Sequence, residues 1–153
     1  MEYECMYATA WGDFYLYADG EGITGLGMRR RNGEFTDRET PLHREAFRQL
    51  TEYLEGKRKD FDLPLKPAGT PFQQRVWQAL REIPYGQTRS YGEIARAVGN
   101  PKASRAIGMA NNRNPVMIFI PCHRVIGTDG RLVGYAGGLD VKERLLRLEE
   151  SHR

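Results

Sequence analysis

The chain has 153 residues, 40% hydrophobic and 28% charged, which suffices for one compact domain or two small ones with real cores. Its sequence has no apolar run of membrane-spanning length, and its acidic start is unlike a signal peptide, so we expect neither a membrane protein nor a secreted one. Two widely separated cysteines predict free thiols in a reducing compartment, which is the cytoplasm, or the nucleus if the host is eukaryotic.

The net charge of +3 is unevenly distributed along the chain. Residues 1–69 carry 10 Lys and Arg against 13 Asp and Glu, whereas residues 70–153 carry 13 against 7. Residues 132–153 balance at 4 against 4, so the whole excess lies in residues 70–131. A localised positive field is what phosphate binding requires, although many domains without this function also carry a basic face.

The N-terminal part is predicted to form a small sheet with one helix. Alternating and aromatic residues separated by glycine turns predict strands within residues 2–28, and residues 29–39 read as a polar loop. The Thr-Pro pair at 40–41 predicts a helix start, and Gly56 predicts the end of that helix. Residues 57–69 contain prolines and a glycine, so we expect a linker and a domain boundary there.

The rest of the chain is predicted to be mainly helical. A second Thr-Pro pair at 70–71 opens a helix, and Ser90 with Glu93 forms a capping box for the next. The pair at 100–101 is expected to start a further helix, to about Asn111, after a turn of about three residues. These two helices indicate a helix-turn-helix.

A last helix is expected to begin at a capping box made by Asp140 and Glu143. The predicted fold class is therefore α/β (α+β) with two domains. Residues 1–69 form a β-sheet with one helix, and residues 70–153 form a mainly α domain that contains the helix-turn-helix.

Three patterns favour ordinary structural roles. Residues 20–25 match a dinucleotide-binding pattern, but a strand-like segment follows where that motif needs a helix, so a hairpin turn is favoured. The three histidines lack ligand spacing, so no metal is expected, and Cys5 fits a small core residue. Residues 29–31 are consecutive arginines that fit a solvated loop, with DNA contact as the alternative.

The most informative stretch is Cys122-His123-Arg124, which a proline introduces after the apolar run 116–120. A Cys-His pair is usually structural, but a thiol becomes reactive when a base or a positive charge lies beside it. Here Arg124 is expected to favour the thiolate, and Glu149 on the last helix can reach back to the imidazole. That arrangement follows the logic of a catalytic triad, although spacing alone leaves the third member open.

The C-terminal part resembles the corresponding domain of the O6-methylguanine-DNA methyltransferases, also called O6-alkylguanine-DNA alkyltransferases. The motifs that carry the resemblance are Ile120-Pro121-Cys122-His123-Arg124-Val125, Gly134-Tyr135-Ala136-Gly137-Gly138-Leu139, Lys142-Glu143-x-Leu145-Leu146, Ser90-Tyr91, Arg105-Ala106-Ile107-Gly108 and Asn114-Pro115. They span about half the chain. The resemblance implies a winged-helix-like helix-turn-helix there and, more weakly, a ribonuclease H-like fold in the N-terminal half.

The family transfers an alkyl group from O6-alkylguanine in DNA to a cysteine, irreversibly and once per molecule, so the resemblance implies Cys122 as the acceptor and no cofactor. His123 would act as general base, through a water, with Glu149 orienting it. Asn114 would support the turn, and Tyr91 would donate toward guanine N3. Activity on O4-alkylthymine stays open.

The resemblance also implies that the base is flipped out of double-stranded DNA, with Arg105 filling the gap and its helix lying in the minor groove. The small neighbours that would allow this close approach are Ser104, Ala106 and Gly108. The expected phosphate contacts are Arg96, Lys102 and Arg113. The expected base pocket contains Tyr91, Met109, Asn111, Val125, Tyr135 and Ala136.

Within that pocket, the backbone carbonyls of Cys122 and Val125 would read the guanine amine. Many relatives have Ser at the position of Ala136, so a side-chain hydroxyl is missing here. We expect a monomer. The alternative from another class is a DNA-binding module without chemistry, which would leave Cys122 and the Gly-Tyr-x-Gly-Gly loop unexplained.

Overall fold

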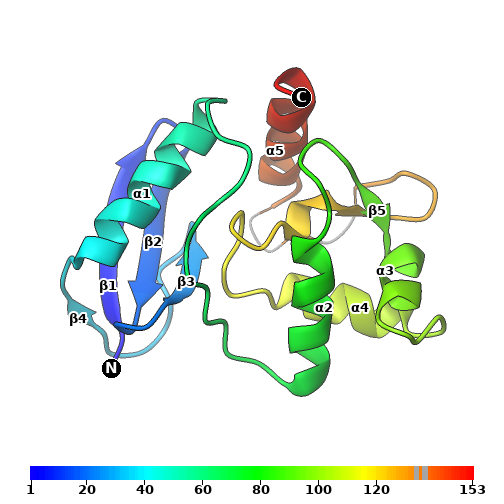
Figure 1. Ribbon diagram of the computed structural model, residues 1–153, viewed down its shortest axis with the longest axis horizontal. Coiled ribbons are helices and arrows are strands. Elements are labelled where there is room, and N and C mark those ends of the chain that lie inside the picture. Colours follow the sequence, from blue (N-terminus) through cyan, green and yellow to red (C-terminus); the bar gives the residue numbers. More distant parts are fainter. Residues whose placement is uncertain (133–134, 136–137) are drawn as a thin grey trace. The chain divides into compact units, whose positions relative to one another are not determined.

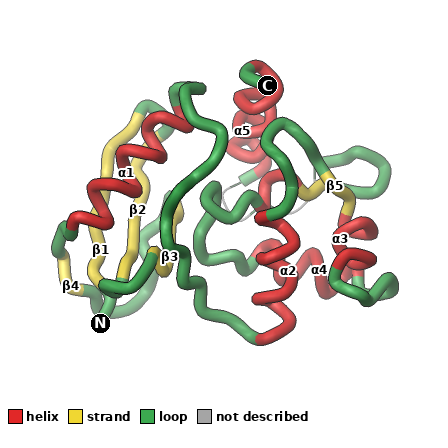
Figure 2. Tube along the Cα trace, in the orientation of Figure 1, coloured by secondary structure: helices red, strands yellow, loops and turns green. Residues whose placement is uncertain are grey.

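The computed structural model describes residues 1–132, 135 and 138–153, and it divides the chain into two compact units, residues 1–68 and 69–153. Figure 1 and Figure 2 show strands and one helix in the first unit and mostly helices in the second. The predicted α/β class, with an N-terminal sheet and a helical C-terminal part, is confirmed. Among the described helices, none is long and apolar enough to cross a membrane.

The first unit contains a four-stranded sheet in the order β3-β2-β1-β4. Its strands are β1 (Tyr3–Thr9), β2 (Gly12–Ala18), β3 (Ile23–Gly27) and β4 (Thr36–Asp37). The first three form an antiparallel meander, and β4 pairs parallel to β1 within the segment predicted to be only a loop. Both residues of β4 are exposed, so the sequence there has no apolar alternation that could predict a strand.

Helix α1 (Pro41–Leu54) begins where the Thr-Pro pair predicts. Thr40 Oγ1 accepts a hydrogen bond from the His43 backbone, and the His43 ring accepts one from the Thr40 backbone at 3.1 Å. The helix lies across one face of the sheet (Figure 1), where Leu50 and the β2 residue Phe14 are both buried. This burial of apolar side chains between helix and sheet is the core of the first unit.

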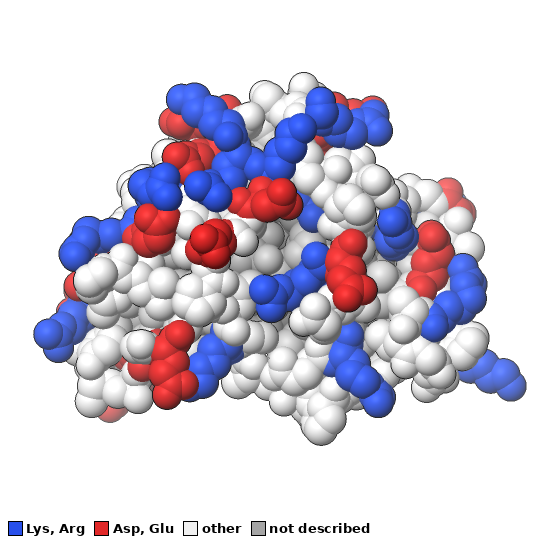
Figure 3. Space-filling view, in the orientation of Figure 1, with Lys and Arg blue, Asp and Glu red and all other residues white. Residues whose placement is uncertain are grey.

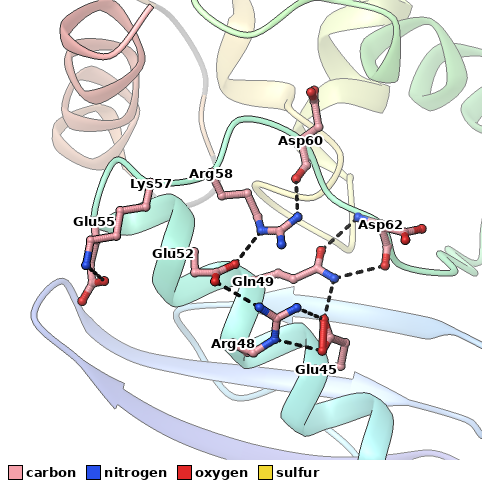
Figure 4. A network of polar contacts seen from close by, with 9 residues as sticks. All are labelled: Glu45, Arg48, Gln49, Glu52, Glu55, Lys57, Arg58, Asp60 and Asp62. Carbon is pink, nitrogen blue, oxygen red and sulfur yellow. Dashed lines mark hydrogen bonds and ion pairs between the residues drawn. The ribbon is translucent and has the colours of Figure 1, made fainter.

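The segment that follows α1 has no helix but is held firmly against the first unit. The Ile23 backbone donates to the Pro64 carbonyl at 2.8 Å, and Lys66 donates back to Ile23 at 2.7 Å, so this segment runs beside β3. Figure 4 shows a polar network that joins the segment to α1. The members with contacts between α1 and the segment are Glu52 with Arg58 and Gln49 with Asp62.

The second unit packs its helices around one apolar core. Its elements are α2 (Pro71–Arg81), β5 (Arg89–Ser90), α3 (Tyr91–Ala97), α4 (Ser104–Asn112), the short 3-10 helix η1 (Cys122–Arg124), β6 (Val125–Ile126) and α5 (Leu139–Ser151). Trp77 of α2 is 1% exposed and donates its indole N–H to the Ala110 carbonyl of α4 at 2.9 Å. This bond and the packing around it fix the position of α4 against α2. The short strands β5 and β6 pair in parallel.

The connection between α3 and α4 is longer than the predicted turn. Helix α3 ends at Ala97 and α4 begins at Ser104. Pro101 follows the first residue of a turn in which the Asn100 carbonyl accepts from the Ala103 N–H at 3.0 Å. Proline favours this turn position as much as the first position of a helix, so the sequence signal was assigned to the wrong structure.

The start of α5 also differs from the prediction. The capping residue is Gly138, with φ of 96°, and no side chain caps the helix. Asp140 instead lies inside the first turn, where its charge complements the helix dipole. The buried side chains of α5 are Lys142, Leu145 and Glu149, which lie along one face because they are three and four residues apart.

Candidate functional site

A short buried segment precedes Cys122 in the second unit. Asn114 holds both ends of this segment by hydrogen bonds: its Oδ1 accepts from the Val116 N–H at 3.0 Å, and its Nδ2 donates to the Ile120 carbonyl at 2.9 Å. Between these ends, Ile118 is buried with φ of 71°, a left-handed conformation that is rare for a β-branched residue. Cys122 follows as the first residue of η1 and is 4% exposed.

His123 and Arg124 share one buried carboxylate. His123 Nε2 lies 2.7 Å from Glu149 Oε2, as the sequence predicts, and both side chains are almost fully buried. Arg124 makes a two-pronged contact with the same carboxylate, Nε to Oε1 and Nη2 to Oε2, each at 2.9 Å. It also donates to the Ile83 carbonyl at 2.6 Å, and the Gly86 N–H donates to Glu149.

The electrostatics of this cluster favour a neutral imidazole beside an ionised carboxylate. Burial raises the pKa of Glu149, but the hydrogen bonds and charges of His123 and Arg124 outweigh burial and bring this pKa to about 2. Burial lowers the pKa of His123, and the opposing effect of Glu149 does not reverse this shift. With Nε2–H donating to Glu149, the neutral ring carries its acceptor at Nδ1.

The Cys122 thiol is not pre-ionised by Arg124, contrary to our expectation. Burial raises the pKa of Cys122, and the influences that lower it come from hydrogen bonds with Asn114 and Tyr135 and from the charge of Lys142. Arg124 is engaged with Glu149 instead. The thiol therefore needs a base to become the thiolate.

Tyr91 and Asn111, which belong to the helix-turn-helix, lie near this thiol. Burial and then the charge of Cys122 raise the pKa of Tyr91, the first residue of α3. Asn111 Nδ2 donates to the Cys122 carbonyl at 3.3 Å. Met109 is 56% exposed on the same helix, and its place in the base pocket stays a prediction.

The other expected pocket residues have mixed outcomes. Val125 is buried directly after η1, and its carbonyl accepts a hydrogen bond from Lys142 Nζ. Tyr135 is partly buried, and its side chain is one of the influences that lower the pKa of the Cys122 thiol. Ala136 lies outside the described residues.

The residues expected to contact DNA lie on or beside α4. Four cations there are exposed and make no ion pair with a described residue: Arg96, Lys102, Arg105 and Arg113. Ser104 and Ala106 are also exposed on α4, and Gly108 is partly buried beside the Tyr91 ring. On the face drawn in Figure 3, basic and acidic side chains are interspersed, so an excess of cations is a local feature of this helix pair and not of that whole face.

Comparison with family models decides the relationship of the chain. The model for the DNA-binding domain of 6-O-methylguanine DNA methyltransferase matches residues 71–151, and the model for the ribonuclease-like domain of the same family matches residues 3–67. The chain belongs to the 6-O-methylguanine DNA methyltransferase family.

Relatives of this methyltransferase family match over almost the whole chain. The methylated-DNA–protein-cysteine methyltransferase of Methanosarcina acetivorans is 51% identical over 97% of this chain and 99% of its own length. The constitutive enzyme of that name from Bacillus subtilis is 59% identical over 97% and 96%. The crystal structure of the Mycobacterium tuberculosis O6-methylguanine methyltransferase, 44% identical, matches with a TM-score of 0.92 over 100% of this chain and 95% of that one. The same bacterium's protein in complex with DNA also matches with a TM-score of 0.92.

Lys142 is the member of the site that sequence reasoning missed. Its side chain is fully buried, and burial lowers its pKa while the charge of Cys122 opposes that shift. The motif of the methyltransferase family contains this lysine, but the motif does not say where the side chain lies. A usable signal was its position three residues before Leu145 and seven before Glu149, on the apolar stripe of α5.

Proposed function

We propose that this chain repairs alkylated DNA by transferring the alkyl group from guanine O6 to Cys122 Sγ. The observation that carries the proposal is the buried contact of 2.7 Å between His123 Nε2 and Glu149 Oε2. His123 directly follows Cys122 in the sequence, and the Cys122 thiol needs a base. Family membership supports the same reaction. The thiol, the base and the alkylated guanine balance all atoms and electrons, so the reaction requires no cofactor or metal.

Proton removal comes first in this mechanism. His123 Nε2 is held by Glu149, so the Cys122 proton arrives at Nδ1, directly or through a water. Glu149 stabilises the imidazolium that forms, and it stays ionised because Arg124 also binds it. Arg124 therefore serves as a positioning residue for the base. Lys142 stabilises the new thiolate by its charge, which is the role that the sequence had suggested for Arg124.

Attack follows along the axis of the bond that breaks. The thiolate forms an S–C bond to the alkyl carbon while the C–O6 bond breaks and its electron pair moves onto the guanine ring. Tyr91 donates toward guanine N3 and neutralises part of that charge. The product is a thioether, which has no easy route back to the thiol, so each molecule acts once.

The alkylated base must leave the duplex before it can meet a buried thiol, at a cost of a few kcal/mol. We place this step at α4, where Arg105 is exposed and the small residues Ser104, Ala106 and Gly108 allow close approach to a minor groove. The phosphate contacts proposed to hold the duplex are Arg96, Lys102 and Arg113. Residues 70–153 thus carry both DNA binding and chemistry, in a protein proposed to act as a monomer.

We also propose that the protein works in the cytoplasm, or in the nucleus of a eukaryotic host. Cys5 and Cys122 are both free thiols, and an acceptor thiol must stay reduced until it meets its substrate.

The test is transfer from a duplex oligonucleotide that contains one O6-methylguanine. After incubation, the tryptic peptide of residues 114–124 should gain about 14 Da, the mass of one CH2 unit. The amount of modified peptide should stop at one equivalent of protein. Cys122→Ser should abolish the transfer and keep duplex binding, since a hydroxyl is far harder to ionise. Methylation of Cys5, or repeated turnover by one molecule, contradicts the proposal.

A further inference from the structure

Helix α4 carries an exposed apolar side chain on the face that we propose for DNA binding. Met109 is 56% exposed, and Met109 and Leu139 are the large apolar side chains that the described part of the second unit leaves exposed. Met109 lies four residues after Arg105, so the two side chains project from the same face of the helix. A single methionine on a surface is ordinary, so the surroundings of Met109 determine what can be inferred from it.

Met109 lines an open groove between α4 and the first turn of α2. The groove has a volume of about 250 Å³, and its apolar walls are Phe72 of α2 and Ala106, Met109 and Ala110 of α4. Arg113 lines the same groove and makes no ion pair with a described residue. The groove therefore combines apolar walls with an unpaired positive charge.

A DNA minor groove has the complementary pattern. Its walls are the apolar faces of the deoxyribose rings, and a row of phosphates runs along each edge. Arg105 lies one turn before Met109 and Arg113 one turn after it, so cations flank the apolar side chain as phosphates flank the sugars. An apolar protein segment would leave both cations without a counter-charge. The walls of the groove also belong to residues 71–151, which match the family's DNA-binding domain.

The spacing along α4 determines what Met109 contacts. Four residues advance a helix by about 6 Å and consecutive base pairs lie about 3.4 Å apart, so Met109 meets the duplex within about two base pairs of Arg105. Apolar side chains, methionine included, that enter a minor groove partly unstack the base step that they contact. A base with an unstacked neighbour has fewer stacking contacts to lose, so its extrusion costs less.

We propose that Met109 is an apolar wedge that unstacks the base pair beside the lesion and so assists the flipping step in which Arg105 fills the gap. This inference rests on the proposed function and adds a second residue to that step. It places Met109 on the duplex and not in the base pocket, where the sequence had predicted it.

The experiment measures single-turnover transfer to Cys122 from two substrates, a duplex with one O6-methylguanine and the free base O6-methylguanine. Met109→Gln keeps the length of the side chain but removes its apolar character, whereas Met109→Leu stays apolar. Both new residues are good helix formers, so α4 should be kept. Met6→Gln is the matched control, because Met6 is a methionine of β1 in the first unit that is 53% exposed.

Met109→Gln should slow transfer from the duplex by about three- to tenfold and leave transfer from the free base unchanged, because the free base needs no extrusion. Met109→Leu should stay within about twofold of the wild type on both substrates, and so should Met6→Gln. The slope of log affinity against log salt should be the same for all of these proteins, since an apolar side chain releases no counterions.

Unstacking is measured directly with 2-aminopurine, whose fluorescence rises when the base leaves the stack. The probe is placed in the base pair on either side of the lesion, and Cys122→Ser provides the background in which the lesion persists. Binding should raise the fluorescence at one of these positions, and adding Met109→Gln should remove most of that rise.

Equal losses on the duplex and on the free base would overturn the inference and return Met109 to the base pocket. Unchanged rates on both substrates would overturn it as well, and so would a 2-aminopurine signal that Met109→Gln does not reduce. If the wild type transfers no methyl group from either substrate to Cys122, the proposed function fails, and this inference fails with it.

Discussion

In residues 1–68, seven cations lie within ion-pair distance of a carboxylate, whereas four exposed cations around α4 have no such partner among the described residues. The first group belongs to surface networks such as the one in Figure 4, where the Arg and Lys side chains pair with nearby glutamates. The second group keeps its field available to a polyanion. A count of charges in a region therefore does not predict its electrostatic field unless the ion-pair partners of each charge are known.

A second contrast lies in burial. The carboxylates paired on α1 are substantially exposed, and pairs of this kind contribute little stability because water screens them. Glu149 is 1% exposed and binds His123 and Arg124 together. Removing a carboxylate from such a site leaves a buried cation uncompensated.

Glu149→Gln should therefore have the largest effect. We expect a loss of about 3–5 kcal/mol in the free energy of unfolding at neutral pH, because Arg124 stays buried without its counter-charge. Transfer should slow by at least about 100-fold, because His123 loses its orienting partner. Urea denaturation and single-turnover kinetics measure the two effects. Glu45→Gln, on the exposed network of α1, is the matched control and should change neither, so similar losses from both variants would remove the contrast.

The same variant predicts a pH dependence of stability. The folded-state pKa of Glu149 is about 2, below its ordinary value of 4.5, so its contribution is complete above pH 4.5. This contribution should disappear as the pH falls from 4.5 toward 2. The stability difference between the wild type and Glu149→Gln should thus be constant near neutrality and shrink in that acidic window. A difference that persists at pH 2 would mean that the lost packing, and not the charge, destabilises the variant.

Lys142→Met should rank second, with a loss of about tenfold in transfer at neutral pH. Without this charge the Cys122 pKa rises further, so less thiolate forms and the pH–rate profile moves to higher pH. Methionine fills a buried site well, so folding should be kept. Lys66→Met serves as the control, because Lys66 pairs with Asp19 at the surface of the first unit. An unshifted profile for Lys142→Met would show that its charge does not reach the thiol.

Arg105→Ala should slow repair of a duplex by roughly tenfold while leaving transfer from free O6-methylguanine nearly unchanged. The free base needs no extrusion, so a side chain that fills the vacated stack contributes nothing to its reaction. Rates on the two substrates give the comparison directly. If both rates fall equally, Arg105 acts on the pocket or the fold and not on base flipping.

The smallest effects should come from the unpaired surface cations. Neutralising Arg96, Lys102 and Arg113 to Gln should flatten the slope of log affinity against log salt by about one unit per lost phosphate contact. Neutralising the arginines at 29–31 is the counter-test, because two of them already pair with Glu4 and Glu2. A slope that changes with 29–31 instead would place the DNA surface on the first unit.

Local signals in the sequence predicted most of the fold. Both Thr-Pro pairs form complete capping boxes, with contacts that lie within three residues. The start of α4 was wrong because Pro101 satisfies a turn and a helix start equally well, and only packing decides between them. The start of α5 was wrong because the helix already begins at Leu139, after Gly138 with its positive φ, so Asp140 lies inside the first turn and does not cap it.

The site was predictable where a motif names the residue and not where a contact depends on distant partners. Cys122, His123 and Glu149 were identified from the sequence, and the last two meet as expected. Arg124 pairs with Glu149, and the buried Lys142 donates to the Val125 carbonyl. In both contacts the two residues are 17 or more positions apart in the sequence. No local pattern records which of several nearby cations a carboxylate will take.

The burial of Cys122 has a consequence for the life of the molecule before it meets damage. Because each molecule reacts only once, any peroxide or other electrophile that modifies the thiol first removes that molecule from repair. Oxidants and electrophiles attack the thiolate, so a nearly inaccessible thiol whose pKa burial raises is protected while it waits. Reaction then needs both proton removal by His123 and a flipped alkylguanine placed against the sulfur, so the same burial that protects the waiting thiol leaves its use to the arrival of substrate.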